Sequence, residues 1–305
     1  MHQEMLEAII RATPETPAYA GKTVLVSGSS SQIGLNIIGI AIARGARVIG
    51  LYHKTPIAFV HPRLTWLRAD LTAPGLPAVP PADILIHTAA IWLLPQSLPG
   101  FVSAGIKRIV VFGSTSIFGK RDSADAAERA VVERLAMAET ELSRMAAEKD
   151  LRLTILRPTM IYGMGLDGNI TRMARMIRKF HFVPICHPGE GLRQPVQAWD
   201  LAEAALAVWD NPTTYGRAYN LGGGDTIPYR AMVERLFRHL GKKPRLVMLP
   251  FLPQALDLLN AFLPSLHVNG EVARRMNRHL AFDNEPAAED FGYRPRGFLA
   301  GDVIL

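Results

Sequence analysis

A short apolar run that ends in a turn of small residues constrains this chain more than any other feature. Residues 22–34 read KTVLVSGSSSQIG. The unbroken, β-rich run at 23–26 is typical of a strand buried inside a parallel sheet. Gly28 and a serine-rich turn follow, and the apolar periodicity of 33–44 predicts a helix. Together they predict the first unit of a dinucleotide-binding fold, in which backbone N–H groups and a helix N-terminus meet a pyrophosphate.

The chain continues as strands that alternate with helices. Apolar, β-rich runs predict further strands at 46–52, 64–67, 83–86, 108–112 and 151–156. An alanine-rich stretch without glycine or proline predicts a long helix over 124–149. Alternation at this spacing predicts an α/β fold with a doubly wound parallel sheet of the Rossmann type.

The character of the sequence changes near residue 160. A basic helix at 170–180, a Pro/His/Gly loop at 183–191 and a helix at 200–210 predict a smaller C-terminal α+β lobe. Such a lobe closes over the carboxyl ends of the strands, where ligands of these sheets bind. We therefore expect three parts, which are a peripheral helical N-terminal arm (1–20), a dinucleotide-binding domain (21–160) and a mainly substrate-binding lobe interleaved with the Rossmann core (161–305).

Composition narrows the classes of function. Cys186 is the only cysteine, which excludes a disulfide framework and a cysteine-built zinc site. No metal site is predicted, and the cysteine usage fits a reducing, cytoplasmic location. The formal net charge of +7 suggests anionic ligands. Lysine and arginine are scattered without aromatic interleaving, so we expect a small-molecule substrate and no nucleic-acid partner.

Neither the N-terminal segment nor the most apolar stretch of the chain has the pattern of a membrane anchor. Residues 1–16 contain early acidic residues and no long apolar core, unlike a signal peptide. Residues 249–268 are the most apolar stretch, but Asp257, Asn260 and three internal prolines argue against a stable membrane span. A lid or a packed amphipathic helix is the expected structure there.

The order of the motifs resembles the extended short-chain dehydrogenase/reductase superfamily, which includes nucleotide-sugar epimerases, dehydratases and reductases. The resemblance extends from about residue 22 to residue 299. The matching pieces are VSGSSSQIG near the start, Asp70-Leu71, His87-Thr88-Ala89-Ala90, VFGSTSIFG (111–119), LRPTMIYG (156–163), LRQPVQAWDLAEA (192–204), YNLGGG (219–224) and DFGYRPRGF (290–298).

The resemblance implies a dinucleotide site at the carboxyl ends of the first strands. The implied cofactor-binding residues are Gly28, Ser30, Ser31, Gln32, Ile33, Gly34, His53, Lys54, Asp70, Leu71, Thr88, Ala89, Ala90, Met137 and Pro158. Ser31 stands where the family has a glycine, so the turn either binds phosphate with shifted geometry or is a loop that binds nothing.

The residues at the ends of the second and third predicted strands suggest how the adenosine part of the cofactor is bound. The family's acidic residue bonds the adenine amino group, a role that would fall to Asp70, although an aspartate there is also a common turn residue. No acidic residue follows the second strand, where NAD-preferring sites place one. Lys54, which follows the second strand, could bind the 2′-phosphate of NADP, so we expect NADP rather than NAD. The alternative is that Lys54 is a solvated loop lysine.

The resemblance also assigns substrate contacts. Ser114 falls where the family has the hydroxyl that bonds the reacting oxygen of the substrate, with Thr115 and Ser116 beside it. Arg193 matches the arginine that grips a nucleotide-sugar diphosphate, a bidentate task suited to guanidinium. The alternatives are a capping serine and a solvated loop arginine.

The family's acid/base pair is missing. The family has a tyrosine with a lysine four residues later, and this chain has no tyrosine between Tyr52 and Tyr162. Alignment of 136–142 places Glu133 at the tyrosine position and Met137 at the lysine position. Either Glu133 lies in a closed cleft, where desolvation raises its pKa and makes it the acid/base, or the protein turns nothing over.

Three functions therefore remain open. The first is an atypical NAD(P)-binding oxidoreductase or epimerase that acts on a phosphate-bearing molecule, most directly a nucleotide sugar. The second is a reductase of an apolar, steroid- or flavonoid-like substrate, with 249–268 as its lid. The third is a catalytically silent NAD(P)-binding structural or sensor protein, like the non-catalytic relatives attached to respiratory complexes. By analogy with the family, 124–149 is a candidate homodimer face.

Overall fold

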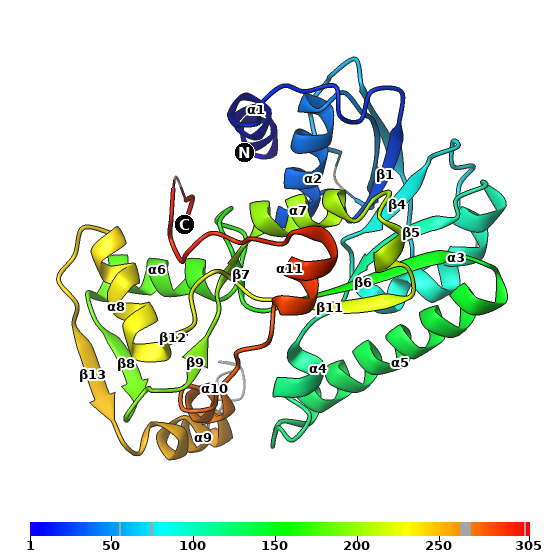
Figure 1. Cartoon of the computed structure of the whole chain (residues 1–305). Helices are drawn as coiled ribbons and strands as arrows, with labels where there is room; N and C mark the ends of the chain where they lie inside the picture. The colour runs from blue at the N-terminus through cyan, green and yellow to red at the C-terminus, as the bar shows by residue number, and fades with distance from the viewer. Residues whose placement is uncertain (55, 74–75, 263–269, 302) are drawn as a thin grey trace.

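A parallel sheet of seven strands forms the centre of the larger part of the molecule (Figure 1). The computed structural model describes residues 1–54, 56–73, 76–262, 270–301 and 303–305. The strand order is β11-β6-β5-β4-β1-β2-β3, and every neighbouring pair is parallel. The strands are β1 (Thr23–Ser27), β2 (Arg47–Tyr52), β3 (Leu64–Arg68), β4 (Ile84–His87), β5 (Arg108–Phe112), β6 (Arg152–Pro158) and β11 (Arg217–Leu221).

Helices cover both faces of this sheet, which explains why its central strands are continuously apolar. One face packs against α1 (His2–Ala12), α2 (Gln32–Ala43) and α7 (Ala198–Ala207). The other face packs against η1 (Ile91–Leu93), α3 (Leu94–Ser103) and α5 (Ala126–Glu148). The predicted α/β, doubly wound fold is confirmed.

The N-terminal segment differs from the expected peripheral arm. It forms a helix, α1, but this helix packs on α2, and its Leu6 is completely buried. Gly39 of α2 permits the approach, because a Cβ there would lie 2.4 Å from a methyl carbon of Ile9. The apolar positions of α1 therefore extend the core.

The chain builds a second lobe from short paired strands and helices, and returns to the main sheet through α7 and β11. The strand pairs are β7 (Ile161–Tyr162) with β10 (Val196–Gln197), β12 (Ile227–Pro228) with β9 (Leu192–Arg193), and β13 (Leu246–Leu249) with β8 (Val183–Cys186). The helical segments beyond those of the sheet are α4 (Ser116–Gly119), α6 (Ile170–Phe180), η2 (Pro212–Thr214), α8 (Tyr229–His239), α9 (Leu252–Phe262), α10 (Gly270–Arg275) and α11 (Glu285–Phe291).

Two expectations for this lobe can be compared with the structure. The predicted helix at 170–180 is confirmed as α6. The loop expected over 183–191 is wrong in its first part, because 183–186 form β8, whose pairing partner β13 lies about sixty positions later in the chain. Within the apolar stretch 249–268, α9 is the expected helix, whereas residues 263–268 lie outside the described residues.

Across the described ranges, every helix is too short or too polar to cross a bilayer.

Candidate functional site

The turn after β1 lies directly against the end of β4. Gly28 has a φ of +74°, and a Cβ on it would lie 2.4 Å from the backbone nitrogen of Ala89. A Cβ on Gly34 would lie 2.6 Å from the carbonyl oxygen of Gly28. Both glycines are therefore required for the close approach of α2 to the turn and of the turn to β4.

Ser31 has a structural part in this turn. Its hydroxyl oxygen caps α2 by accepting a hydrogen bond from the Gly34 N–H at 3.0 Å. The same hydroxyl lies 2.9 Å from the Thr88 hydroxyl, which in turn donates to the carbonyl oxygens of Ser27 or Gly28, each at 2.9 Å. The serine that replaces the family glycine thus ties the turn to β4.

The turn also retains what an anion needs. Within the described part of the chain, no acceptor meets the backbone N–H groups of Ser30, Gln32 and Ile33. Unpaired N–H groups at the first turn of a helix form an anion site. This turn fits a pyrophosphate.

The ends of β2 and β3 bring His53, Lys54 and Asp70 to one edge of the sheet. His53 Nε2 lies 3.3 Å from Asp70 Oδ2. The same carboxylate accepts hydrogen bonds from the side chain and the backbone N–H of Thr72, at 2.6 and 2.9 Å, and these bonds lower the pKa of Asp70. Asp70 is therefore a turn aspartate that still borders the site, and Lys54 is exposed.

His87 at the end of β4 has a partner on each ring nitrogen. Nδ1 lies 2.7 Å from the Ser27 hydroxyl, and Nε2 lies 3.2 Å from the carbonyl oxygen of Ala90. Burial lowers the pKa of His87 to about 4. The ring is thus neutral and has a structural role: it fixes the segment 88–90, which faces the turn after β1.

The segment after β5 carries the predicted substrate hydroxyls. Ser114 Oγ accepts a hydrogen bond from the Ser116 N–H at 3.1 Å, and no acceptor for the Ser114 hydroxyl proton occurs among the described residues. Thr115 is anchored to the Pro158 carbonyl oxygen by its N–H and by its hydroxyl, each at 3.1 Å. Ser114 is therefore fixed in place with its proton available to a ligand oxygen.

The structure does not bring Glu133 or Met137 into this site. Both side chains are exposed on α5, and Met137 is 71% exposed. The buried positions of α5 include Val132, Leu135 and Ala138, so the helical period places 133 and 137 on the outer face. The alternative in which Glu133 is desolvated in a closed cleft is wrong, as is the expected place of Met137 among the cofactor-binding residues.

Glu139 is the acidic residue that this helix buries. Its carboxylate receives hydrogen bonds from Arg157 Nε at 3.0 Å to each oxygen and from Nη2 at 2.5 Å. Gly113 makes room, because a Cβ there would lie 2.6 Å from Glu139 Oε1. This ion pair holds α5 to the ends of β5 and β6. The sequence analysis missed this residue, and the spacing of 132, 135, 139 and 142 on one helix face is the signal that could have found it.

A second ionic cluster joins the two lobes. Glu128 at the start of α5 lies 3.0 Å from Lys120 Nζ, accepts a hydrogen bond from Ser123 at 2.8 Å, and pairs with Arg275 of α10. Burial raises the pKa of Glu128, but the hydrogen bonds from Ser123, Lys120 and Arg275 outweigh it and hold the pKa below its usual value. No local sequence signal predicts a contact between residues 147 positions apart.

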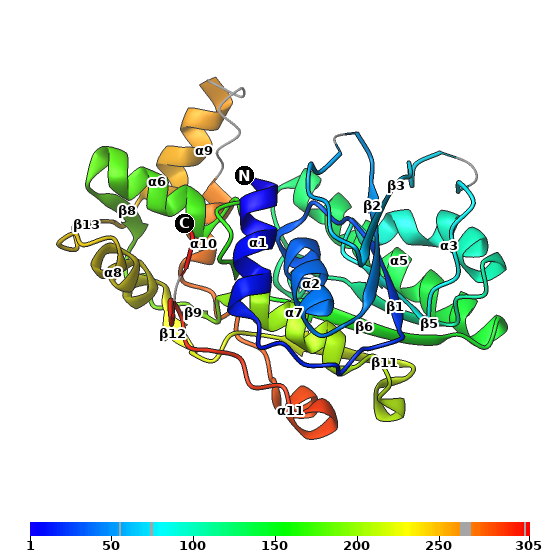
Figure 2. The ribbon, with the colours of Figure 1, turned by 90° about the horizontal axis from the view of Figure 1, so that it is seen from above.

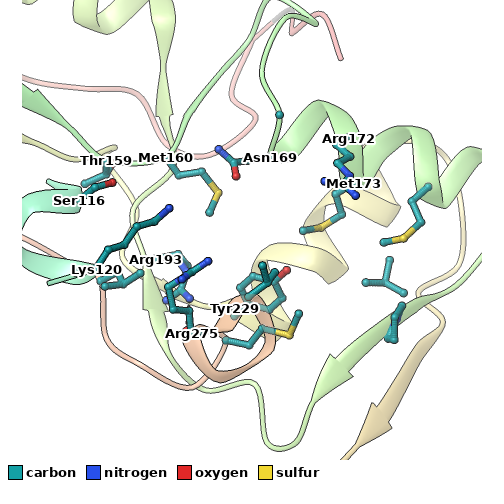
Figure 3. Close-up of a pocket in the computed structure, with 18 of the residues that line it drawn as sticks. Ser116, Lys120, Thr159, Met160, Asn169, Arg172, Met173, Arg193, Tyr229 and Arg275 are labelled. Atoms are coloured by element: carbon teal, nitrogen blue, oxygen red, sulfur yellow. Dashed lines mark hydrogen bonds between the residues drawn. The ribbon is translucent and has the colours of Figure 1, made fainter. Parts of the chain in front are cut away.

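A cavity of about 720 Å³ lies beside these residues, between the sheet edge and the second lobe (Figure 3). Ser116 and Thr159 lie at one end of it, and Thr115 is also among its lining residues. Its charged lining residues are all basic: Lys120, Arg172, Arg175, Lys179, Arg193 and Arg275. Its remaining wall is largely apolar, with Met160, Met173, Met176, Leu252, Leu256 and Phe282 among the lining residues. The cavity suits an anionic ligand with an apolar part.

Arg193 is buried in the cavity wall. Its Nη1 donates to the carbonyl oxygens of Leu192 and Arg278, each at 2.8 Å, and its Nη2 donates to that of Arg275. The guanidinium lies 5.3 Å from the ring centre of Tyr229. Burial lowers its pKa to about 10, so it stays charged at neutral pH. Among the described residues, its Nε–H and one Nη2–H find no acceptor, which leaves two N–H groups for a ligand.

Comparison with known proteins agrees with this geometry. Residues 98–222 match the model of the NAD dependent epimerase/dehydratase family. Over 203 residues the chain is 21% identical to the UDP-glucose 4-epimerase of Vibrio cholerae, a match that covers 64% of this chain and 60% of that protein. The resemblance to the extended short-chain dehydrogenase/reductase superfamily is confirmed.

A second relative of this epimerase/dehydratase-like chain has a different description. It is NADH dehydrogenase (ubiquinone) 1 alpha subcomplex subunit 9, mitochondrial, of Arabidopsis thaliana, 31% identical over 99 residues. That match covers 32% of this chain and 24% of the plant protein. The chain thus matches less than two thirds of the length of either relative.

Solved structures extend the likeness of the fold to nearly the whole chain. The dTDP-glucose 4,6-dehydratase from Streptomyces venezuelae, solved with NAD and TYD bound, has a TM-score of 0.69 and 19% sequence identity. The match covers 91% of this chain and 93% of that one. At this identity the likeness concerns the fold alone.

Proposed function

We propose that this protein binds a nicotinamide dinucleotide, NADP in preference to NAD, and is an oxidoreductase or epimerase that acts on a phosphate-bearing small molecule of the nucleotide-sugar kind. The cavity, whose described lining includes six basic residues, no acidic one, and Thr115 and Ser116, is the observation that supports this most. When bound, the cofactor would supply hydride transfer. Ser114 would donate a hydrogen bond to the reacting oxygen, and the two remaining N–H groups of Arg193 would hold a diphosphate.

The turn after β1 has the groups that a dinucleotide needs, which supports the proposed binding of the cofactor. The unpaired N–H groups of Ser30, Gln32 and Ile33 would hold the pyrophosphate. The backbone of Ala89 lies so close to Gly28 that no side chain fits between the end of β1 and the end of β4. Lys54, exposed after β2, would meet the 2′-phosphate of NADP. The dehydratase of similar fold was crystallised with NAD, which makes the preference for NADP a point to be measured.

Titration calorimetry with NADP and with NAD tests this function. We expect NADP to bind about ten-fold more tightly, because a lysine and no carboxylate would meet the ribose 2′-position. Lys54→Ala should abolish the difference, whereas Lys149→Ala, at an exposed lysine far from this edge, should keep it. Equal or tighter binding of NAD would refute the preference for NADP. If neither dinucleotide binds, the proposed function is wrong.

The proposed diphosphate contact predicts a specific loss in an Arg193→Lys variant. Lysine keeps the charge but not the two parallel donors, so the affinity for UDP-glucose should fall by about 1–3 kcal/mol while NADP affinity stays unchanged. Arg172→Lys, at an exposed cavity residue, is the matched control and should have little effect. Calorimetry would measure both. A parent protein that binds no nucleotide sugar would favour the second candidate below.

A second candidate function has its own support. The methionine, leucine and phenylalanine side chains of the cavity would suit an apolar substrate, as a reductase of steroid- or flavonoid-like molecules needs. The exposure of Glu133 supports the third, catalytically silent interpretation, because the acid at the position of the family tyrosine faces solvent and Glu139, the acid that α5 buries, is paired with Arg157. Turnover of any substrate by the purified protein would exclude this third interpretation.

The same proposal includes a cytoplasmic location and a homodimer formed through α5. The exposed side chain of Met137 lies there beside Trp92, over whose ring Arg134 stacks at 4.1 Å. Light scattering on the purified protein would measure the oligomeric state.

A further inference from the structure

Helix α9 exposes a continuous apolar stripe. Phe251, Ala255, Leu258 and Phe262 follow a helical spacing, and the exposed fractions of Phe251, Leu258 and Phe262 are 73%, 62% and 76%. The opposite side of the helix faces the cavity, which Leu252 and Leu256 line. Large exposed apolar side chains gathered on one helix face mark an interaction surface.

Neighbouring elements enlarge the stripe into a surface. Phe180 and Phe182, at the end of α6 and before β8, are 52% and 43% exposed, and their rings lie 6.5 Å apart. Phe180 borders the cavity together with Leu252 and Leu256 of α9. Figure 2 shows α6 and α9 on the same side of β8 and β13, with α9 projecting from the lobe. We call the α9 stripe with Phe180 and Phe182 the apolar surface.

Unpaired positive charge flanks the apolar surface. No aspartate or glutamate occurs in 168–189 or in 235–256, whereas these two windows contain nine of the chain's 34 lysine and arginine residues. Seven of the nine form no ion pair with any described residue: Arg172, Arg175, Arg178, Lys179, Lys242, Lys243 and Arg245. The pairing of β8 with β13 holds the two windows side by side.

We propose that this part of the second lobe docks on the surface of a membrane that contains anionic lipids. The aromatic and leucine side chains of α9 would enter the boundary between head groups and acyl chains, while the four of these cations that do not line the cavity, Arg178, Lys242, Lys243 and Arg245, would face lipid phosphates. Charge argues against a second copy of this chain as the occupant, because a symmetric contact would place two unneutralised basic clusters together. A helix that is apolar on one side and flanked by lysine and arginine is typical of interfacial binding.

Docking would have a consequence for the cavity. Its lining includes Phe180, which belongs to the apolar surface, and Leu256, which lies on the other side of α9. A substrate with an anionic head and an apolar tail would enter from the membrane with its head towards the basic residues. This extension rests on the proposed function, whereas the docking itself does not.

Sedimentation with vesicles tests the docking without any cofactor or substrate. We expect the protein to bind vesicles of phosphatidylcholine with phosphatidylglycerol, and to bind vesicles of phosphatidylcholine alone at least about ten-fold more weakly. The double variant Phe251→Ser/Leu258→Ser should lose at least about ten-fold in binding to the anionic vesicles, as should Lys243→Glu/Arg245→Glu. All four of these side chains are exposed, so folding should be kept.

Matched variants on the other lobe control for general effects. Val60→Ser removes a side chain that is 96% exposed, and Lys149→Glu reverses an exposed charge; both should bind anionic vesicles like the parent. Absence of vesicle binding by the parent would overturn the proposal. So would equal loss in the control variants, or a dimer in solution that Phe251→Ser/Leu258→Ser dissociates. None of these results would bear on binding of a dinucleotide, which calorimetry measures separately.

Discussion

Replacement of Glu139 with alanine is expected to lower the free energy of unfolding by about 3 kcal/mol, the largest effect on stability that we predict. The variant leaves the Arg157 guanidinium without its partner. Because only 20% of the arginine side chain is exposed, water cannot fully replace the lost carboxylate. The pair also joins α5 to the ends of β5 and β6, so its loss frees the segment that positions Ser114. Denaturation in urea, followed by circular dichroism, would measure the change.

Two further variants separate the ion pair from the helix itself. Glu133→Ala changes the same residue type on the exposed side of α5 and should alter stability by less than about 0.5 kcal/mol. Glu139→Leu/Arg157→Met removes both charges and should cost less than Glu139→Ala, because no buried charge is left unpaired. A loss in Glu133→Ala as large as that in Glu139→Ala would contradict the assignment of the ion pair.

Replacement of Gly28 with alanine should reduce the affinity for NADP by about 100-fold or more, because the turn that would hold the pyrophosphate must move. The added Cβ would lie 2.4 Å from the backbone nitrogen of Ala89, closer than real Cβ atoms approach. In addition, the positive φ of +74° costs alanine about 1–2 kcal/mol. Calorimetry with NADP and thermal unfolding would measure the two effects.

Gly241→Ala is the matched control for this variant. Gly241 has a φ of +68°, and a Cβ there would meet nothing within 4 Å. The control should therefore show the backbone cost alone and bind NADP like the parent. If Gly28→Ala keeps full NADP affinity, the turn after β1 does not hold the pyrophosphate, although NADP could still bind elsewhere.

The sequence by itself determined six of the seven strands of the sheet and the turn after β1. The apolar, β-rich runs predict the six strands from β1 to β6 because a strand buried on both faces needs them, and this requirement is local. Gly28 was likewise predicted at the turn, where a tight strand-to-helix connection needs a residue that tolerates a positive φ. The basic helix predicted at 170–180 is α6.

Only the tertiary structure decided which side chains face the site. Alignment placed Glu133 at the acid/base position, but burial depends on which helix face meets the sheet, and α5 buries Glu139 instead. β8 looked like a loop because its partner β13 lies far along the chain. The contact of Glu128 with Arg275 and the two remaining N–H groups of Arg193 depend on residues brought together by the second lobe. Such contacts have no local signal, because packing of distant segments creates them.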